Sequence, residues 1–268
     1  MERLLTLHVL ASGSKGNAYL VEGPDGSLLV DDGLSRRELL RRGAELGVDV
    51  EAASACVVTH EHGDHVRGLA VWCRHWRGLL VASEGTATAR PAMEALPFET
   101  VVPGEGFSVA GLEVSTFPTS HDVRQPMGVT VRCGGDAVGI CTDTGVLTPE
   151  AARTLAGMRI LALESNHDEA MLRGGPYPAY LKARVAGERG HLSNAQAAAA
   201  LPSLVTRETE AVVAMHLSQE NNRPSVAVRC LAAAVGAEPL DALGVHAATP
   251  DGRLRVLAAA QDAPVSVF

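Results

Sequence analysis

Short, mostly apolar runs alternate with turn residues over the start of the chain. The runs span residues 5–10, 18–21 and 27–30, and Gly, Ser, Asn, Pro and Asp occupy the gaps between them. This spacing predicts three strands in an antiparallel meander. An amphipathic stretch rich in Arg and Leu follows and predicts a helix over 35–46, with Ser35 as its N-cap and Gly47 just past its end.

Beyond this point, strand patterns alternate with helical ones. We expect strands at 56–58, 79–82, 113–117, 128–132, 137–141, 160–163 and 211–215, and helices at 66–76, 85–96, 149–156, 194–204 and 224–235. A hairpin of 244–248 and 254–258 is expected to close the chain. Strands that occur both in meanders and between helices predict an α/β fold with two mixed sheets covered by helices.

Composition narrows the class of protein. A chain of 268 residues that is 46% hydrophobic and has no low-complexity linker favours one domain, spanning 1–268. The five cysteines are odd in number and lack C-x-x-C spacing, which indicates free thiols in a reducing compartment. No stretch approaches the ~20 apolar residues of a membrane span, and the apolar start is too short for a signal peptide. We therefore expect a cytoplasmic protein without membrane contacts.

The charge balance leaves the substrate open. The net charge of −8 argues against an overall electrostatic attraction to nucleic acid, although a local basic patch is enough for a catalytic groove. Only Lys15 and Lys182 are lysines, so the positive charge is almost entirely arginine. Compositional bias and phosphate binding explain this equally well. The oligomeric state is not indicated.

The densest chemistry lies in Thr59–His65, where three histidines and an aspartate fall within seven residues between a predicted strand and a predicted helix. On an extended chain, His60 and His62 project to the same side and reach a common ion. Gly63 allows a sharp turn that brings Asp64 and His65 toward a second ion. Asp64 alone would also serve as a helix N-cap, but the H-x-H-x-D-H spacing as a whole predicts a metal site.

The run His60-Glu61-His62-Gly63-Asp64-His65 resembles the signature of the metallo-β-lactamase superfamily of hydrolases. The resemblance implies a four-layer αββα sandwich, with two mixed sheets packed face to face, helices outside, and one or two metals at the sheet edge. Three later residues each follow a predicted strand and resemble the family's later motifs: His121, Asp143 and His216. The implied assignment places His60, His62 and His121 on one ion, Asp64, His65 and His216 on the other, and Asp143 between them.

This ligand set implies a chemistry. Imidazoles and carboxylates suit Zn²⁺ and also admit Mn²⁺ or Fe²⁺, so we expect two divalent ions of open identity. Two ions sharing Asp143 would lower the pKa of a bridging water and hold hydroxide against an electrophile, and Asp64 is expected to take part in catalysis. Asp31 resembles the superfamily's early Asp-x-Gly position, where a carboxylate orients a ligand imidazole. A simple Asp-Gly turn is the alternative for Asp31, and Asp32 competes for the role.

Three further segments are similar to the bacterial YycJ or WalJ family, relatives of ribonuclease Z. They are Ser12–Asn17, Glu164–Asp168, and Gly190–Asn194 with His216–Pro224. The resemblance implies a metal-dependent nuclease, and in particular a DNA exonuclease. By resemblance to ribonuclease Z, His191 is expected to be the general acid that protonates the leaving oxygen, with Glu164 orienting it and raising its pKa. Alternatively, His191 only precedes the cap of the next helix.

Substrate contacts are expected mainly from the second half of the chain. Residues 171–189 form a long segment interrupted by Pro and Gly, which predicts a loop. Its basic residues would form a rim that grips phosphate; a solvated charged loop is the alternative. The expected substrate-binding residues are Asn17, His167, Ser193, Asn194, Lys182 and Arg184.

The sequence therefore predicts a dinuclear metal-dependent phosphodiesterase that hydrolyses nucleic acid by a hydroxide bridging the metals. In particular, it predicts an exonuclease that acts on DNA. One alternative keeps the metals and changes the substrate to a small phosphodiester or a thioester. Another is a metal-stabilised signalling or scaffold protein without turnover.

Overall fold

The structure, a computed structural model, describes residues 3–268. The chain forms two compact units. The first contains the residues up to Pro118 together with 123–138 and 261–268, and the second contains 119–122 and 139–260. The expectation of a single domain over 1–268 stays a prediction. Among the residues described, no helix has the length and apolar character of a membrane span.

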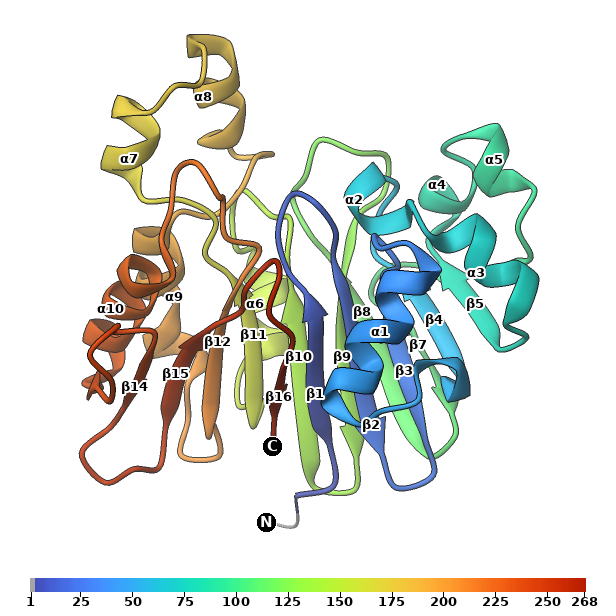
Figure 1. Cartoon of the computed structure of the whole chain (residues 1–268), viewed down its shortest axis with the longest axis horizontal. Helices are drawn as coiled ribbons and strands as arrows, with labels where there is room; N and C mark the ends of the chain where they lie inside the picture. The colour runs from blue at the N-terminus through green and yellow to red at the C-terminus, as the bar shows by residue number, and fades with distance from the viewer. Residues whose placement is uncertain (1–2) are drawn as a thin grey trace. The chain divides into compact units, whose positions relative to one another are not determined.

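A mixed sheet of seven strands dominates the first unit (Figure 1). In spatial order its strands are β16 (Val265–Val267), β1 (Thr6–Ala11), β2 (Ala18–Gly23), β3 (Gly26–Val30), β4 (Ala55–Val58), β5 (Leu79–Ala82) and β6 (Phe98–Thr100). Pairing is antiparallel from β16 to β3 and parallel from β3 to β6. The predicted meander is thus confirmed as β1–β3, in which Gly23 pairs with Gly26 across a turn of Pro24 and Asp25.

Helices cover one face of this sheet. They are α1 (Arg36–Leu46), a 3₁₀ turn (Val50–Ala52), α2 (Gly63–Val66), α3 (Leu69–His75), α4 (Glu84–Ala87) and α5 (Pro91–Glu94). The predicted caps of α1 are confirmed, because Ser35 accepts a hydrogen bond from the Glu38 amide and Gly47 takes a left-handed φ of 75°. Leu39 of α1 and Trp72 of α3 share one buried cluster with sheet residues such as Leu29. This cluster holds the helices against the sheet.

Two predicted helices are broken in the structure. The helix expected over 66–76 is interrupted at Gly68, whose amide donates to the Asp32 carbonyl instead of continuing the helical ladder. The helix expected over 85–96 is split before Pro91, because a residue that precedes proline is pushed out of the helical region, and Arg90 is extended. Helical periodicity predicted these regions correctly but did not predict the breaks.

The first unit also contains an antiparallel group of strands, β7 (Gly106–Val109), β8 (Leu112–Pro118) and β9 (Met127–Cys133). This group packs closely on the seven-stranded sheet: a Cβ placed on Gly23 would lie 2.7 Å from Leu112 Cδ2, and one on Gly26 would lie 2.7 Å from Ala110 Cβ. The first unit therefore contains two β layers in contact, and helices cover the seven-stranded one.

In the second unit, helices pack on a mixed group of strands. The strands, in spatial order, are the end of β10 (Asp136–Cys141), β11 (Ile160–Glu164), β12 (Ala211–Met215), β15 (Arg255–Ala258), β14 (His246–Ala248) and β13 (Glu238–Pro239). The helices α6 (Pro149–Leu155), α9 (Asn194–Leu204) and α10 (Pro224–Val235) match the predicted ones. The predicted hairpin is confirmed as β14 and β15, but it does not close the chain, because β16 follows it and pairs with β1.

The long loop expected over 171–189 is largely helical. It contains most of α7 (Glu169–Gly174) and all of α8 (Ala179–Val185). Asp168 caps α7 by accepting hydrogen bonds from the amides of Ala170 and Met171, and Pro178 precedes α8. Of the Pro and Gly residues that suggested a continuous loop, Gly175, Pro176 and Pro178 lie between the two short helices, Gly174 ends α7, and Gly187 follows α8.

Candidate metal-ligating site

In the first unit, the Thr59–His65 motif joins β4 to α2, as its position between a strand and a helix predicted. His60 and His65 are buried, and their ring centroids lie 4.0 Å apart. The ring of His62 lies 4.9 Å from that of His60, at nearly a right angle. Asp64 Oδ2 lies 3.6 Å from His65 Nε2. The motif therefore brings three imidazoles and one carboxylate close together.

Asp31 holds one of these imidazoles. Its Oδ2 lies 2.7 Å from His65 Nδ1, and the same carboxylate accepts hydrogen bonds from the amide and hydroxyl of Thr59. Because an ionised carboxylate only accepts hydrogen bonds, His65 carries its proton on Nδ1 and presents Nε2 as the ligand atom. Asp32 lies elsewhere, beside Gly68, where an added Cβ would come within 2.5 Å of Asp32 Oδ1. Asp31, not Asp32, contacts the imidazole.

Asn17 shows that this group of acceptors suits a cation. Its buried Nδ2 lies 2.9 Å from His65 Nε2, 3.2 Å from Asp64 Oδ2 and 3.1 Å from the Gly13 carbonyl oxygen. Its Oδ1 accepts from the Gly13 amide and the Tyr19 hydroxyl, which fixes the orientation of the amide. An N–H donor surrounded by acceptors occupies a position whose electrostatics favour positive charge. The residues present therefore fit a divalent metal.

In the second unit, Glu164 at the end of β11 is the centre of a buried network. Its Oε1 lies 2.8 Å from His191 Nδ1 and 3.0 Å from His216 Nδ1. Its Oε2 accepts from the amides of Thr144 and Leu192. Burial opposes the negative charge, but attraction and hydrogen bonds from His191, with a further bond from His216, hold the pKa of the carboxyl well below its usual range. Glu164 is therefore an anion that orients two imidazoles.

Two further predicted ligands lie in the same unit. His121 Nδ1 lies 3.0 Å from the Gly190 carbonyl oxygen, which fixes that nitrogen as the donor, and its Nε2 lies 3.7 Å from Asp143 Oδ1. Asp143 Oδ1 also lies 3.6 Å from His216 Nδ1. Candidate ligand atoms within 4.8 Å of one another come from Asp143, Glu164, His191 and His216. The second unit thus gathers residues that are widely separated in the chain.

Three of these residues adopt a strained backbone. Asp31, Asp143 and His216 have φ values of 62°, 57° and 54°, in a left-handed region that residues other than glycine rarely enter. Each follows the end of a strand, respectively β3, β10 and β12. Such strain persists only where surrounding contacts impose it, and it is typical of functional sites. For His216, a hydrogen bond from the Asn166 side chain to its carbonyl, 2.8 Å long, supplies part of this restraint.

The expected substrate-binding residues fall into different environments. Asn17 and Asn194 are buried, and the Asn194 amide is bonded to Ser165 and Asn222. Ser193 caps α9 in a capping box with Gln196. Lys182 Nζ donates to the Arg173 carbonyl, and Arg184 Nε donates to Asp122 Oδ2 at 2.5 Å. The backbones of His167 and Ser193 form a β-bridge. Several of these groups thus have structural partners, and their roles toward substrate stay predictions.

Sequence reasoning missed three positioning groups. They are the Thr59 hydroxyl beside Asp31, the Asn166 side chain beside His216, and the Gly190 carbonyl beside His121. Thr59 directly precedes the histidine motif and Asn166 lies within the Glu164–Asp168 motif, so proximity to a motif was a usable signal for both. Gly190 begins the Gly190–Asn194 segment, but every residue has a backbone carbonyl, so the segment did not single out this one.

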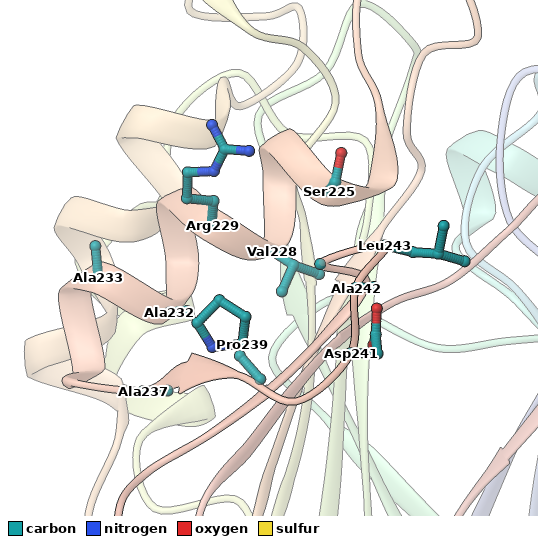
Figure 2. Close-up of a pocket in the computed structure, with 12 residues that line it drawn as sticks. Ser225, Val228, Arg229, Ala232, Ala233, Ala237, Pro239, Asp241, Ala242 and Leu243 are labelled. Atoms are coloured by element: carbon teal, nitrogen blue, oxygen red, sulfur yellow. The ribbon is translucent and has the colours of Figure 1, made fainter.

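A separate pocket of about 380 Å³ lies between α10 and the turn at 239–244 (Figure 2). Small apolar side chains, among them Val228 and Ala232, form most of its wall. Asp241, on its edge, is paired with His246 at 2.9 Å. None of the predicted site residues lines this pocket, so it does not belong to the candidate site.

Residues 27–217 match the model of the beta-lactamase superfamily domain. The chain is 35% identical to the exodeoxyribonuclease YycJ of Bacillus anthracis, over 83% of this chain and 86% of that protein. It is 32% identical to the exodeoxyribonuclease WalJ of Streptococcus pneumoniae, over 80% of this chain and 82% of that protein.

The fold agrees with these sequence matches. The metallo-β-lactamase fold protein YhfI from Bacillus subtilis superposes with a TM-score of 0.70, over 99% of this chain and 100% of that one, at 13% identity. The predicted family and its αββα fold are confirmed, and the scaffold reading without turnover is set aside. The chain belongs to the metallo-β-lactamase superfamily, among the relatives of YycJ and WalJ, and is a metal-dependent hydrolase.

Proposed function

We propose that this hydrolase cleaves phosphodiester bonds of nucleic acid, and that it acts as a DNA exonuclease. The single observation that carries the proposal is the contact between Glu164 Oε1 and His191 Nδ1, 2.8 Å long. The leaving group of a phosphodiester is an alkoxide, which needs a proton. The leaving group of a thioester is a thiolate, which does not. A histidine with a carboxylate partner therefore favours phosphodiester cleavage over the thioester alternative. The similarity to two exodeoxyribonucleases supports the same choice.

The metal ligands are proposed on the order of the family's motifs. We assign His60, His62 and His121 to one divalent ion, Asp64, His65 and His216 to a second, and Asp143 to both, with Zn²⁺ or Mn²⁺ as the metal. When bound, such ions lower the pKa of water and polarise a phosphoryl oxygen. Asp31 supports this role from outside the ligand set, because it fixes Nδ1 of His65 as the protonated nitrogen.

His191 supplies the proton in this proposal. Its Nδ1–H donates to Glu164. In the doubly protonated ring, the Nε2–H is therefore the donor that remains for the substrate. As the P–O bond to the leaving nucleotide breaks, the Nε2–H bond also breaks and its proton forms an O–H bond on the leaving oxygen. The imidazole is then neutral, and the bound carboxylate of Glu164 has stabilised the imidazolium that preceded it. A positioned acid of this kind contributes ~10²–10⁴-fold in rate.

A nuclease assay tests the proposal. The purified protein with Mn²⁺ or Zn²⁺ is incubated with end-labelled single- and double-stranded DNA and RNA, and with bis-p-nitrophenyl phosphate and a glutathione thioester. We expect release of mononucleotides from DNA ends, loss of activity in EDTA, and no activity in His60→Ala and Asp143→Ala. Unchanged activity in both variants would refute the mechanism, and preference for the thioester would refute the substrate class.

A further inference from the structure

A pocket of about 190 Å³ lies beside the segment that carries His191. Its wall includes His167, Leu172, Ala186 and Gln196, and Ser193 adds to it. The segments around His167 and His191 are bonded to each other, because the Asn166 amide donates to the Leu192 carbonyl and the Asn194 amide to the His167 carbonyl. The pocket, which we call the His167 pocket, is therefore fixed relative to the proposed general acid.

His167 has hydrogen-bonding capacity that the protein does not use. The side chain is 1% exposed, and among the residues described no group bonds to its Nδ1. Burial lowers the pKa of His167, which favours the neutral ring with one donor and one acceptor nitrogen. Buried polar atoms normally have partners, so an orphaned one in a pocket wall indicates a ligand that supplies the partner.

The other walls restrict the kind of ligand. Leu172 and Ala186 are apolar and suit the face of a flat ring. Gln196 keeps its Oε1 on the Ser193 amide, which leaves its Nε2 to meet a polar edge. The two charged wall residues are paired with each other, Arg173 with Glu169 at 3.7 Å, and Glu169 also accepts from the Ser193 hydroxyl at 3.1 Å. The pocket therefore offers no net positive charge to a phosphate. The volume is below the ~300–1,000 Å³ of pockets for whole drug-sized ligands, so it suits one ring system.

We propose that the His167 pocket receives one nucleobase of the substrate strand, that of the nucleotide whose oxygen His191 protonates. The inference rests on the proposed nuclease function. An uncharged ring with polar edges matches walls that are apolar on two sides and offer an imidazole and an amide. Holding this base fixes the sugar attached to it, and therefore the leaving oxygen, beside His191. The enzyme thus requires a base at this nucleotide and does not act on the phosphodiester backbone alone.

Binding in EDTA tests the pocket without cleavage. Fluorescently labelled single-stranded oligonucleotides carry a tetrahydrofuran abasic residue at each position from the end in turn. For the native protein we expect affinity to fall about 10-fold when the abasic residue occupies one position, since a stacked base contributes on that scale. Ala186→Phe fills the pocket from an exposed position, and His167→Ala removes its buried polar group. Both should lose this discrimination.

Matched variants provide the controls. Ala183→Phe adds the same ring at an exposed position of α8 outside the pocket, and Ala233→Phe adds it in the separate pocket beside α10. Both variants should show the same fall in affinity at one abasic position as the native protein does. Equal affinity at every abasic position, or identical behaviour of Ala186→Phe and Ala183→Phe, would overturn the base pocket.

Cleavage of the same oligonucleotides with metal separates this inference from the proposed function. A protein that degrades normal and abasic strands alike is a nuclease without the base pocket. A protein that has one abasic-sensitive position in EDTA but cleaves no substrate has the pocket and not the nuclease activity. Absence of oligonucleotide binding in EDTA together with absence of cleavage in the presence of metal would overturn both.

Discussion

Glu164 Oε1 lies 2.8 Å from His191 Nδ1, although the two residues are 27 positions apart in the chain. The same oxygen lies 3.0 Å from His216 Nδ1, so one carboxylate orients both the proposed acid and a proposed metal ligand. Because the carboxylate can only accept, both rings carry their proton on Nδ1 and present Nε2. The proposed acid and the proposed metal ligand are thus positioned by one buried anion.

The role of His191 predicts a dependence on the leaving group. His191→Ala should lower kcat on DNA by about 10²–10⁴-fold, and by much less on bis-p-nitrophenyl phosphate, because p-nitrophenolate leaves without a proton. Steady-state kinetics on both substrates, with the metal content of each variant determined, measure the difference. Equal losses on the two substrates would contradict general-acid catalysis by His191.

The contact between Asp31 and His65 predicts an effect on metal affinity. Asp31→Asn should weaken divalent-metal binding about 10–100-fold, because the amide no longer holds the His65 tautomer as strongly. Competition with a metal-binding indicator dye measures this. Asp136→Asn is the control: Asp136 is also buried in the first unit, but it accepts from the amides of Leu4 and Leu5, so its loss should reduce stability without changing metal affinity.

Asp32 predicts a pH dependence of folding. Burial, assisted by repulsion from Asp31 and opposed by the Leu34 amide, raises its pKa from 3.8 to about 7. Between these values the native state binds a proton that the unfolded state has released, so the free energy of unfolding falls as pH rises and levels off above about pH 7, with a total loss of roughly 4 kcal/mol.

Asp32→Asn should remove this slope, because the amide stays neutral. Urea unfolding of both proteins in EDTA, at about pH 5 and about pH 8, isolates the effect, since the other titrating groups cancel in the difference. The variant should gain stability relative to the native protein at the higher pH. If the two proteins differ in free energy of unfolding by the same amount at both pH values, Asp32 does not titrate in this range.

The close packing of Gly33 predicts a steric effect on the Thr59–His65 motif. A Cβ at this position would lie 1.7 Å from the Asp64 carbonyl oxygen and 2.6 Å from the Asn17 amide nitrogen. Gly33→Ala should therefore displace the backbone of Asp64, lowering stability by at least ~1–3 kcal/mol and weakening metal binding. Gly174→Ala is the matched control, because a Cβ there meets nothing within 4 Å. Chemical denaturation and metal titration of both variants provide the comparison.

The sequence by itself determined most of the elements and predicted the candidate ligands. Residue periodicity and turn chemistry are local properties, which is why the helix from Arg36 to Leu46 and the strands of the meander were predicted with their caps and turns. The H-x-H-x-D-H run was equally accessible, since its residues are neighbours in the chain and need no long-range folding to come together. Helix breaks such as that at Gly68 were missed because a distant backbone, that of Asp32, competes for the amide.

Only the tertiary structure decided which groups hold the site residues. Asp31 is 34 positions from His65, Glu164 is 52 from His216, and Gly190 is 69 from His121. These partners depend on strand register and on the course of loops, which local preferences do not encode. The same holds for the pairing of β16 with β1 and for the His167 pocket, whose walls come from separate helices. The sequence therefore predicted the candidate ligands, and long-range packing decided their tautomers, their orientation and the space beside them.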